Sequence, residues 1–200
     1  MKKEEFEKIA ERCAQLEANR DKSFEDAAEL YVLERFLGEE SAVDSPFDAE
    51  RHFSNAVECA AALAKIDESH VLTHAKAMAK LAAFYAGRAD LFYDKAIESY
   101  HSALAIAQNI ADEDSRTMMI AEIEFGMGRM YSDRGGVPVT EYFQRAFDAC
   151  DSLVKKGVKL EDDALKVVML CSTLLQTVYE EAGDHAAARD IRMRSRKFLL

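Results

Sequence analysis

The histidine spacing is the first pattern in this sequence that could support chemistry. His70 and His74 stand four residues apart, so on a helix both side chains would lie on one face and could bind the same metal ion. The motif contains no carboxylate, and no other segment supplies an obvious third ligand. We therefore interpret the pair as partly exposed surface histidines. The remaining histidines are isolated, and we expect them on the surface or at helix ends: His52, His101 and His185.

The acidic residues and cysteines also lack the spacing of a catalytic or metal centre. Neighbouring carboxylates such as Glu122 and Glu124 point in different directions on a helix and do not face one site. Gly135-Gly136 is not followed by the lysine of a phosphate-binding loop. No two cysteines have C-x-x-C spacing, and we expect four small buried side chains: Cys13, Cys59, Cys150 and Cys171. These patterns predict neither an enzyme nor a metal or cofactor site.

The charge of the chain argues against two classes of partner. The sequence has 37 acidic and 26 basic residues, a net charge of −11. Such a chain repels the phosphates of nucleic acids and the anionic surface of a membrane. No apolar run is long enough for a transmembrane helix, and acids interrupt the N-terminal segment where a signal peptide needs an apolar stretch. We therefore expect a cytoplasmic protein whose partner is a protein or peptide, and neither a nucleic acid nor a membrane.

The elements that carry these residues are predicted to be helices. Only eight glycines and two prolines occur in 200 residues, and no segment sustains the alternation of a strand. Apolar residues recur at helical spacing, as in this stripe near the N-terminus: Phe6, Ile9, Ala10, Cys13 and Leu16. About nine helices follow, delimited near Ser23, Gly38, Pro46, Asp67, Gly87, Asp90, Pro138, Gly157 and Gly183. The expected fold class is all-α.

Two markers recur along the predicted helices with one long period. In three alternate helices an aromatic residue is flanked by small or aliphatic residues, at Ala49/Phe53/Ala56, Ala96/Tyr100/Ala103 and Val139/Phe143/Ala146. In the preceding helices an aromatic residue recurs every 46 to 49 positions, at Phe36, Tyr85, Tyr131 and Tyr179. Small residues let two helices approach closely, and an aromatic ring fills the space beside them. We therefore expect these aromatic residues to pack in the core rather than to contact a ligand.

The repeats resemble the tetratricopeptide repeat (TPR) family. The segment Tyr179-x3-Gly183-Asp184-x3-Ala188 matches the tyrosine, turn glycine and alanine of the family, and residues 93–97 resemble the start of its second helix. The period here is 43 to 49 residues instead of about 34, and the consensus tryptophan and closing proline are absent. The chain therefore resembles the longer-repeat variants of the family. HEAT-type repeats share this period and remain the alternative.

The resemblance implies four antiparallel helical hairpins stacked into a right-handed superhelix, a TPR-like α-solenoid. The hairpins are expected at about residues 23–66, 67–110, 112–156 and 160–200. A further helix within residues 1–22 would cap the N-terminal end, since a terminal repeat needs a polar outer face. In a competing frame, a second helix starts at Phe24-Glu25-Asp26-Ala27 and pairs with this first one.

The resemblance also implies a non-enzymatic protein-interaction module. In the family the first helix of each hairpin lines a concave groove that binds a peptide or protein segment. The residues expected to face a partner are Lys76, Lys80, Glu122, Phe125, Arg129, Thr173 and Thr177. The carboxylate clamp of the chaperone-binding members is not reproduced, so we expect no binding to chaperone C-termini.

The last predicted helix is basic although the chain is acidic. Residues 184–200 contain five bases and two acids. The stripe that can dock on the preceding helix comprises Ala188, Ile191, Ser195 and Phe198. Off this stripe, Arg192 and Arg196 could meet an acidic surface of the partner or of a second copy. The alternative function is therefore a self-assembling structural protein with this helix as subunit interface, and a simpler interpretation is a solvated cap whose bases favour the helix dipole.

Overall fold

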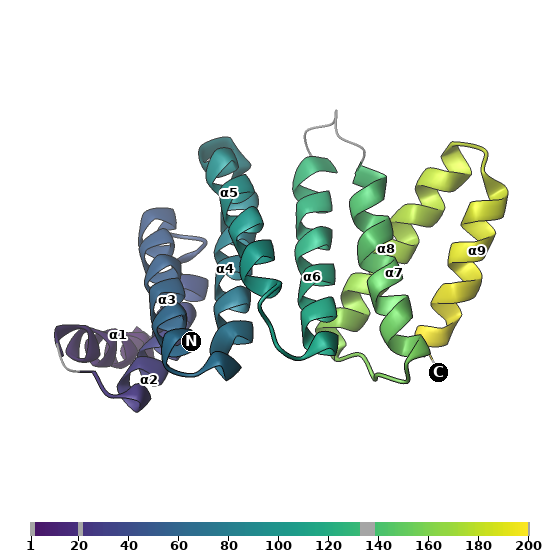
Figure 1. Cartoon of the computed structure of the whole chain (residues 1–200). Helices are drawn as coiled ribbons and strands as arrows, with labels where there is room; N and C mark the ends of the chain where they lie inside the picture. The colour runs from purple at the N-terminus through teal and green to yellow at the C-terminus, as the bar shows by residue number, and fades with distance from the viewer. Residues whose placement is uncertain (1–2, 20–21, 133–138, 200) are drawn as a thin grey trace. The chain divides into compact units, whose positions relative to one another are not determined.

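The computed structural model describes residues 3–19, 22–132 and 139–199, and every regular element within them is a helix (Figure 1). The nine α-helices in these ranges are α1 (Lys3–Ala18), α2 (Phe24–Ser41), α3 (Pro46–Ile66), α4 (Val71–Ala86), α5 (Ala89–Ala107), α6 (Glu113–Ser132), α7 (Val139–Lys155), α8 (Asp162–Glu181) and α9 (His185–Ser195). Two 3-10 helices adjoin them, η1 (Glu68–His70) and η2 (Arg196–Leu199). The all-α prediction is confirmed for this part of the chain. The predicted turn at Gly135-Gly136 and the helix start at Pro138 lie outside the described residues.

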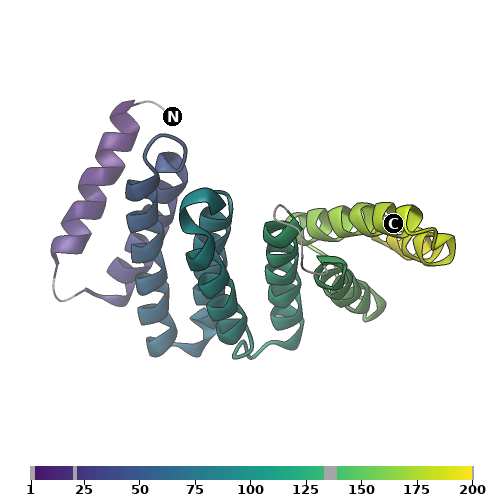
Figure 2. The same cartoon turned by 90° about the horizontal axis from the view of Figure 1, so that it is seen from above.

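Neighbouring helices pack as consecutive pairs. α2 packs on α3, α4 on α5, α6 on α7 and α8 on α9, while α1 lies against α2 (Figure 2). The chain forms two compact units, Met1–Ala111 (unit 1) and Asp112–Leu200 (unit 2), and each has its own hydrophobic core. The predicted packing of adjacent helices is therefore confirmed within each unit. Among the helices of the described ranges, none has both the length and the apolar character needed to cross a membrane.

Several helix ends form at the residues that the sequence indicated. The Ser23 hydroxyl accepts a hydrogen bond from the backbone N–H of Asp26 at 3.1 Å, and the Asp26 carboxylate accepts one from the backbone N–H of Ser23 at 3.1 Å. This reciprocal capping box satisfies two backbone donors at the start of α2. Gly157 and Gly183 adopt φ values of +86° and +76° after α7 and α8. Glycine enters this left-handed conformation without steric cost, which explains both helix ends.

Gly38 does not end α2, in contrast to the sequence prediction. The helix continues to Ser41, and Gly38 is buried under the ring of Phe53, where an added Cβ would lie 2.9 Å from Cδ1. Gly128 meets the ring of Phe143 in the same way, and a Cβ there would lie 2.8 Å from Cε1. Each ring therefore packs directly on the backbone of the paired helix, and this close approach requires glycine.

We expect Gly128→Ala to destabilise unit 2 by about 1–2 kcal/mol. Overpacking a core costs about 1–3 kcal/mol, and the higher helix propensity of alanine offsets at most about 1 kcal/mol of that loss. Gly87→Ala is the matched control, because a Cβ at that position meets its nearest atom at 3.5 Å. Urea unfolding followed by circular dichroism measures both variants. Equal unfolding midpoints for the two variants would contradict the close contact at Gly128.

Four of the seven aromatic markers of the repeats are buried in the cores, whereas Phe36, Tyr131 and Tyr179 are half-buried. Tyr85, Tyr100 and Phe143 are 6%, 3% and 3% exposed, as the sequence predicted. Tyr131 is half-buried, and its ring centroid lies 5.4 Å from that of Tyr142. The buried rings of Tyr85, Tyr100 and Phe143 therefore pack between helices rather than facing a ligand.

The prediction of small buried side chains is confirmed for three of the four cysteines. All four are free thiols; Cys13, Cys150 and Cys171 are buried, and Cys59 is half-buried. Burial raises the pKa of Cys150 and that of Cys171 to about 12. The thiols in the core of unit 2 therefore stay protonated at neutral pH and pack as small apolar groups.

Candidate functional site

Two of the predicted partner-facing residues are lysines on α4 in unit 1. Lys76 and Lys80 are both exposed. Lys80 Nζ lies 3.0 Å from Glu39 Oε1 on α2, and 49% of the lysine side chain remains exposed. An ion pair this open to solvent contributes little to stability. Both lysines therefore remain accessible to a carboxylate of a partner.

The His70/His74 pair lies at the start of α4, and the two rings have different surroundings. His70 packs edge-on against Phe24, with 5.3 Å between the ring centroids. His74 is half-buried, and burial together with the charge of Lys65 lowers its pKa. His70 thus contributes to packing between helices, and the surroundings of His74 favour its neutral form.

On α6 in unit 2 the predicted partner-facing residues separate into buried and exposed ones. Phe125 is 8% exposed, and its ring centroid lies 6.0 Å from that of Phe143 on α7. Its side chain therefore belongs to the core rather than to an exposed face, because α7 covers it. Arg129 is exposed, with its guanidinium 6.0 Å from the Phe125 ring centroid. Glu122 is half-buried. Arg129 is the exposed member of this group.

The α8 helix carries an exposed stripe with the spacing of one helix face, formed by Leu170, Thr173, Leu174 and Thr177 (the α8 stripe). Leu170 is 49% and Leu174 37% exposed, although both side chains are large and apolar. The hydroxyls of Thr173 and Thr177 donate to carbonyls of their own helix at 3.0 and 3.1 Å. The stripe therefore offers a mainly apolar surface. The threonines were predicted from the sequence, whereas the leucines were not.

The docking stripe of α9 has the predicted orientation. Ala188, Ile191 and Ser195 are buried. Phe198, in the following 3-10 helix, packs edge-on against Phe147, with 5.8 Å between the ring centroids. The apolar spacing in the sequence thus identified the face that covers the core of unit 2.

The arginines of α9 are less accessible than the sequence suggested. Arg192 donates from Nε to Gln176 at 3.0 Å and from Nη2 to Glu180 at 2.7 Å, so its guanidinium is bound to α8 of the same unit. Arg196, the first residue of η2, is exposed, and Met193 on α9 is 55% exposed. Of the two arginines predicted to contact a partner, Arg196 is therefore the one free of these contacts to α8.

A buried ionic network fixes α9 on α7. Asp151 is 1% exposed, and its Oδ2 lies 2.7 Å from Lys155 Nζ and 2.8 Å from Arg194 Nη2. Arg194 also pairs with Asp148, and its guanidinium lies 4.7 Å from the Phe147 ring centroid. Burial acts to raise the pKa of Asp151, but the hydrogen bonds from Lys155 and Arg194 outweigh it and lower the pKa below its ordinary value. The carboxylate therefore stays ionised and holds two cations in place.

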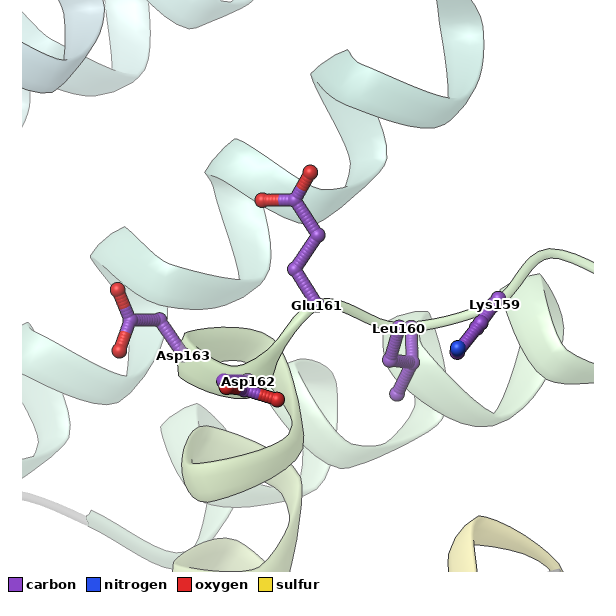
Figure 3. A pocket seen from close by; sticks show the side chains of 5 residues that line it. All are labelled: Lys159, Leu160, Glu161, Asp162 and Asp163. Atoms are coloured by element: carbon purple, nitrogen blue, oxygen red, sulfur yellow. The ribbon is translucent and has the colours of Figure 1, made fainter.

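A shallow surface depression of about 500 Å³ lies at the start of α8 (Figure 3). Its lining residues are Lys159, Leu160, Glu161, Asp162 and Asp163. In Figure 3 the three carboxylates point away from one another. Acid–base catalysis or metal binding requires groups that converge on one point. The depression does not provide such a constellation.

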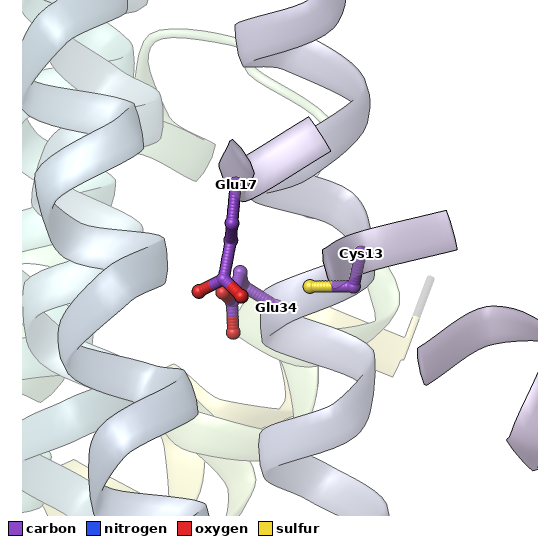
Figure 4. A group of neighbouring side chains, drawn as sticks. All are labelled: Cys13, Glu17 and Glu34. Atoms are coloured by element: carbon purple, nitrogen blue, oxygen red, sulfur yellow. The ribbon is translucent and has the colours of Figure 1, made fainter. Parts of the chain in front are cut away.

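The prediction that His52 lies on the surface is wrong, because it is 8% exposed and belongs to a polar group in unit 1 that also contains the buried Glu34 and the exposed Glu17 (Figure 4). Its Nδ1 lies 2.6 Å from Glu34 Oε2. Asn55 Nδ2 donates to Glu34 Oε1 at 2.9 Å and to Glu17 Oε1 at 3.0 Å. Cys13 contacts the same Glu34 carboxylate. We call these five residues the Glu34 cluster.

Protons are distributed unequally in the Glu34 cluster. Burial, with a smaller effect from the Glu34 charge, raises the pKa of Cys13 to about 12. Burial and a hydrogen bond to Glu34 raise the pKa of Glu17. Burial acts on Glu34 in the same direction, but hydrogen bonds from its neighbours, His52 first, outweigh it and lower its pKa. Glu34 is therefore the carboxylate that most readily carries the negative charge of the cluster.

No protein-family model matches this chain. Searches of curated proteins and of solved structures likewise find no similar protein. The repeat resemblance therefore stays a prediction from the sequence. The function has to be inferred from the exposed residues of the two units.

Proposed function

We propose that the chain is a non-enzymatic protein-interaction module of the cytoplasm, a TPR-like α-solenoid that binds a peptide or protein segment along a concave groove. The α8 stripe carries this proposal, because it presents two leucines and two threonines at the spacing of one helix face. Scattered apolar residues are normal on protein surfaces, whereas contiguous ones mark interaction sites. The recurring aromatic markers support the repeat architecture.

The chemistry of the stripe favours a partner segment with apolar side chains. Burying the exposed part of each leucine would contribute about 1 kcal/mol, given about 1.5–3 kcal/mol for a whole side chain. Two such contacts supply only part of a micromolar affinity, about −8 kcal/mol. Arg129, exposed on α6 of the same unit, can add a contact to an acidic group. On unit 1, the exposed Lys76 and Lys80 are also positively charged and can contact acidic groups in the same way.

The test is the double variant Leu170→Asp/Leu174→Asp. Proteins retained by the immobilised chain from the cells that make it are identified by mass spectrometry, and the affinity of the purified partner is then measured. We expect at least about 10-fold weaker binding, because two apolar contacts of about 1 kcal/mol each are lost. Val32→Asp, at an α2 position that is 51% exposed, is the matched control and should bind normally. Unchanged affinity of the double variant would contradict the role of the α8 stripe.

The second candidate function is self-assembly through α9. Met193 on α9 is 55% exposed, Arg189 precedes it by four residues on the same helix, and Arg196 follows it by three residues at the start of η2. Residues 184–200 carry a net charge of +3, which leaves −14 for the rest of the chain. A basic helix with an exposed apolar centre is complementary to an acidic surface, and a second copy supplies such a surface.

We expect Arg189→Glu/Arg196→Glu to abolish any assembly that depends on α9. Opposite charges orient an encounter, and their effect is screened beyond about 8 Å at physiological ionic strength. The measurement is the mass in solution by light scattering at low and high salt. Lys76→Glu, another exposed base, is the control for net charge. An identical mass for the wild type and the double variant at both salt concentrations would exclude this candidate function.

A further inference from the structure

Three of the four most exposed large apolar side chains in the described residues lie near the starts of α3 and α5 in unit 1. Val43 in the turn before α3, Phe47 on α3 and Leu91 on α5 are each at least 60% exposed. The Phe47 ring centroid lies 6.1 Å from that of Phe92, the residue after Leu91, so the two helix starts lie side by side. We call Val43, Phe47 and Leu91 the unit 1 patch. Apolar side chains gathered in this way mark interaction sites, whereas single ones do not.

A packed group of aromatic rings supports the unit 1 patch. The Phe92 ring is buried, and its centroid lies 5.3 Å from that of Tyr85 and 6.2 Å from that of Phe84. Phe84 packs in turn against Phe53, with 5.2 Å between the centroids. Phe47 is the exposed end of this group. A ring supported by its neighbours loses little conformational freedom when a partner covers it, which favours its use as a binding anchor.

Unpaired acids accompany the patch along the chain. The exposed acids within three residues of Phe47 or Leu91 are Asp44, Asp48, Asp90 and Asp94. Within the part of the chain that the structure describes, none of these four carboxylates forms an ion pair. Residues 42–50 and 87–95 together hold five acids and two bases, a net charge of −3. An apolar surface with this charge is complementary to a basic segment that also carries an apolar side chain.

The last helix of the same chain is such a segment. Arg189 and Met193 are four residues apart on α9, so they share one face, and both are exposed. Arg196 and Lys197 follow on η2 and are exposed as well. Among the described residues, none of these three bases has an ion-pair partner. One apolar side chain among three unpaired bases is the counterpart, with opposite charge, of the unit 1 patch.

We propose that the unit 1 patch of one copy binds α9 and η2 of a second copy. This contact depends on the second candidate function, self-assembly through α9, and gives α9 its receiving surface. Met193 packs against Phe47 and Leu91, and the bases of α9 and η2 face the aspartates beside the patch. Because the two surfaces differ, the contact joins copies head to tail and leaves one free surface at each end of the pair. Such an interface continues into a ring or an open chain of copies.

The first experiment measures the mass of the full chain by light scattering over a range of concentrations. Phe47→Lys/Leu91→Lys (the patch variant) removes two apolar contacts and places like charge opposite the bases. Burying the exposed part of one such side chain strengthens binding about 10-fold, so we expect association at least about 100-fold weaker. Val32→Lys/Ile66→Lys is the matched control, because it adds the same charge at two exposed apolar positions of unit 1 outside the patch. The control should assemble like the wild type, and circular dichroism should be unchanged in both variants.

Mixing two variants tests the head-to-tail contact directly. The patch variant keeps an intact α9, and Arg189→Glu/Arg196→Glu (the α9 variant) keeps an intact patch. Each variant alone should be monomeric. Their equimolar mixture should form a dimer with one copy of each and nothing larger, because each copy retains one of the two surfaces. The dimer should weaken as the salt concentration rises, since exposed charges are screened.

The outcomes distinguish failure of this contact from failure of self-assembly. If the α9 variant is monomeric but the patch variant assembles like the wild type, α9 binds elsewhere and the proposal is overturned, while self-assembly stands. A mixture that stays monomeric would overturn it as well, because the two intact surfaces then do not bind each other. If the wild type is monomeric in low salt at its highest soluble concentration, the proposal and self-assembly both fail. The patch would then be left for a basic segment of another protein.

Discussion

Phe147→Ala is expected to destabilise unit 2 by about 3–5 kcal/mol, the range for truncating a large buried aromatic side chain. The Phe147 side chain is 0% exposed. Its ring contacts Phe198 edge-on at 5.8 Å and lies 4.7 Å from the guanidinium carbon of Arg194. The substitution therefore leaves a cavity in the core and removes the surface on which α9 and the following 3-10 helix rest.

Phe47→Ala is the matched control for this substitution. Phe47 is 71% exposed, and its ring meets Phe92 only at the edge, with 6.1 Å between the centroids. A contact of this kind is worth about 0.5–1.5 kcal/mol, so we expect a loss of at most about 1.5 kcal/mol. Urea unfolding monitored by circular dichroism gives both values. Similar losses for the two variants would show that Phe147 does not occupy a closed core.

Arg194→Met is expected to cost about 2–4 kcal/mol at neutral pH. Removing one partner of a buried ion pair costs about 3–5 kcal/mol because the remaining charge is left without compensation. Lys155 still contacts Asp151 in the variant, which reduces the loss. Arg192→Met on the same helix is the control, since the Arg192 side chain is 55% exposed and its ion pair with Glu180 is accessible to solvent. The control should lose at most about 1 kcal/mol.

The pH dependence distinguishes charge from packing in this network. The pKa of Asp151 is lowered in the folded protein. Its contribution is therefore complete above the unfolded pKa of about 3.9 and is lost as the pH falls through the lower folded value. The difference in unfolding free energy between the wild type and Arg194→Met should shrink in acid. A difference that stays the same between neutral pH and about pH 2 would assign the effect to packing alone.

The order and the ends of the helices were largely predictable because they depend on neighbouring residues. The capping box at Ser23 and the left-handed glycines Gly157 and Gly183 act within one helical turn, and the structure confirms them. Gly38 has the same local character, yet α2 continues past it. Its glycine is required by the ring of Phe53 on the next helix. The residues next to Gly38 in the sequence do not reveal its contact with Phe53, because Phe53 lies on another helix.

Only part of the Glu34 cluster could be predicted from the sequence. Glu34 lies four residues after Leu30 and three before Leu37, so a charged residue stands on the buried face of α2. That position indicates a buried polar group. Its partners His52 and Asn55 are 18 and 21 residues away, and they meet it only because α3 packs against α2. Which residues of the two helices face one another depends on that packing and could not be derived from periodicity.

The accessibility of the predicted partner-facing residues also could not be derived from periodicity. Phe125 was assigned to an exposed face through the family resemblance, but α7 covers it in unit 2. Leu170 and Leu174 have the spacing of core residues, yet both are substantially exposed on α8. Helical spacing identifies which residues share a face. Whether another helix covers that face is a tertiary property.

The contact of Gly128 with the Phe143 ring also constrains how this protein can diverge during evolution. A side chain at position 128 fits only after the ring at position 143 has become smaller, because a Cβ would lie 2.8 Å from the present ring. Phe143→Leu followed by Gly128→Ala passes through an underpacked intermediate, whereas the reverse order passes through a steric clash. Substitutions in contact are coupled, so neither position drifts freely. Lineages of this protein are therefore expected to change these two positions together or to keep both.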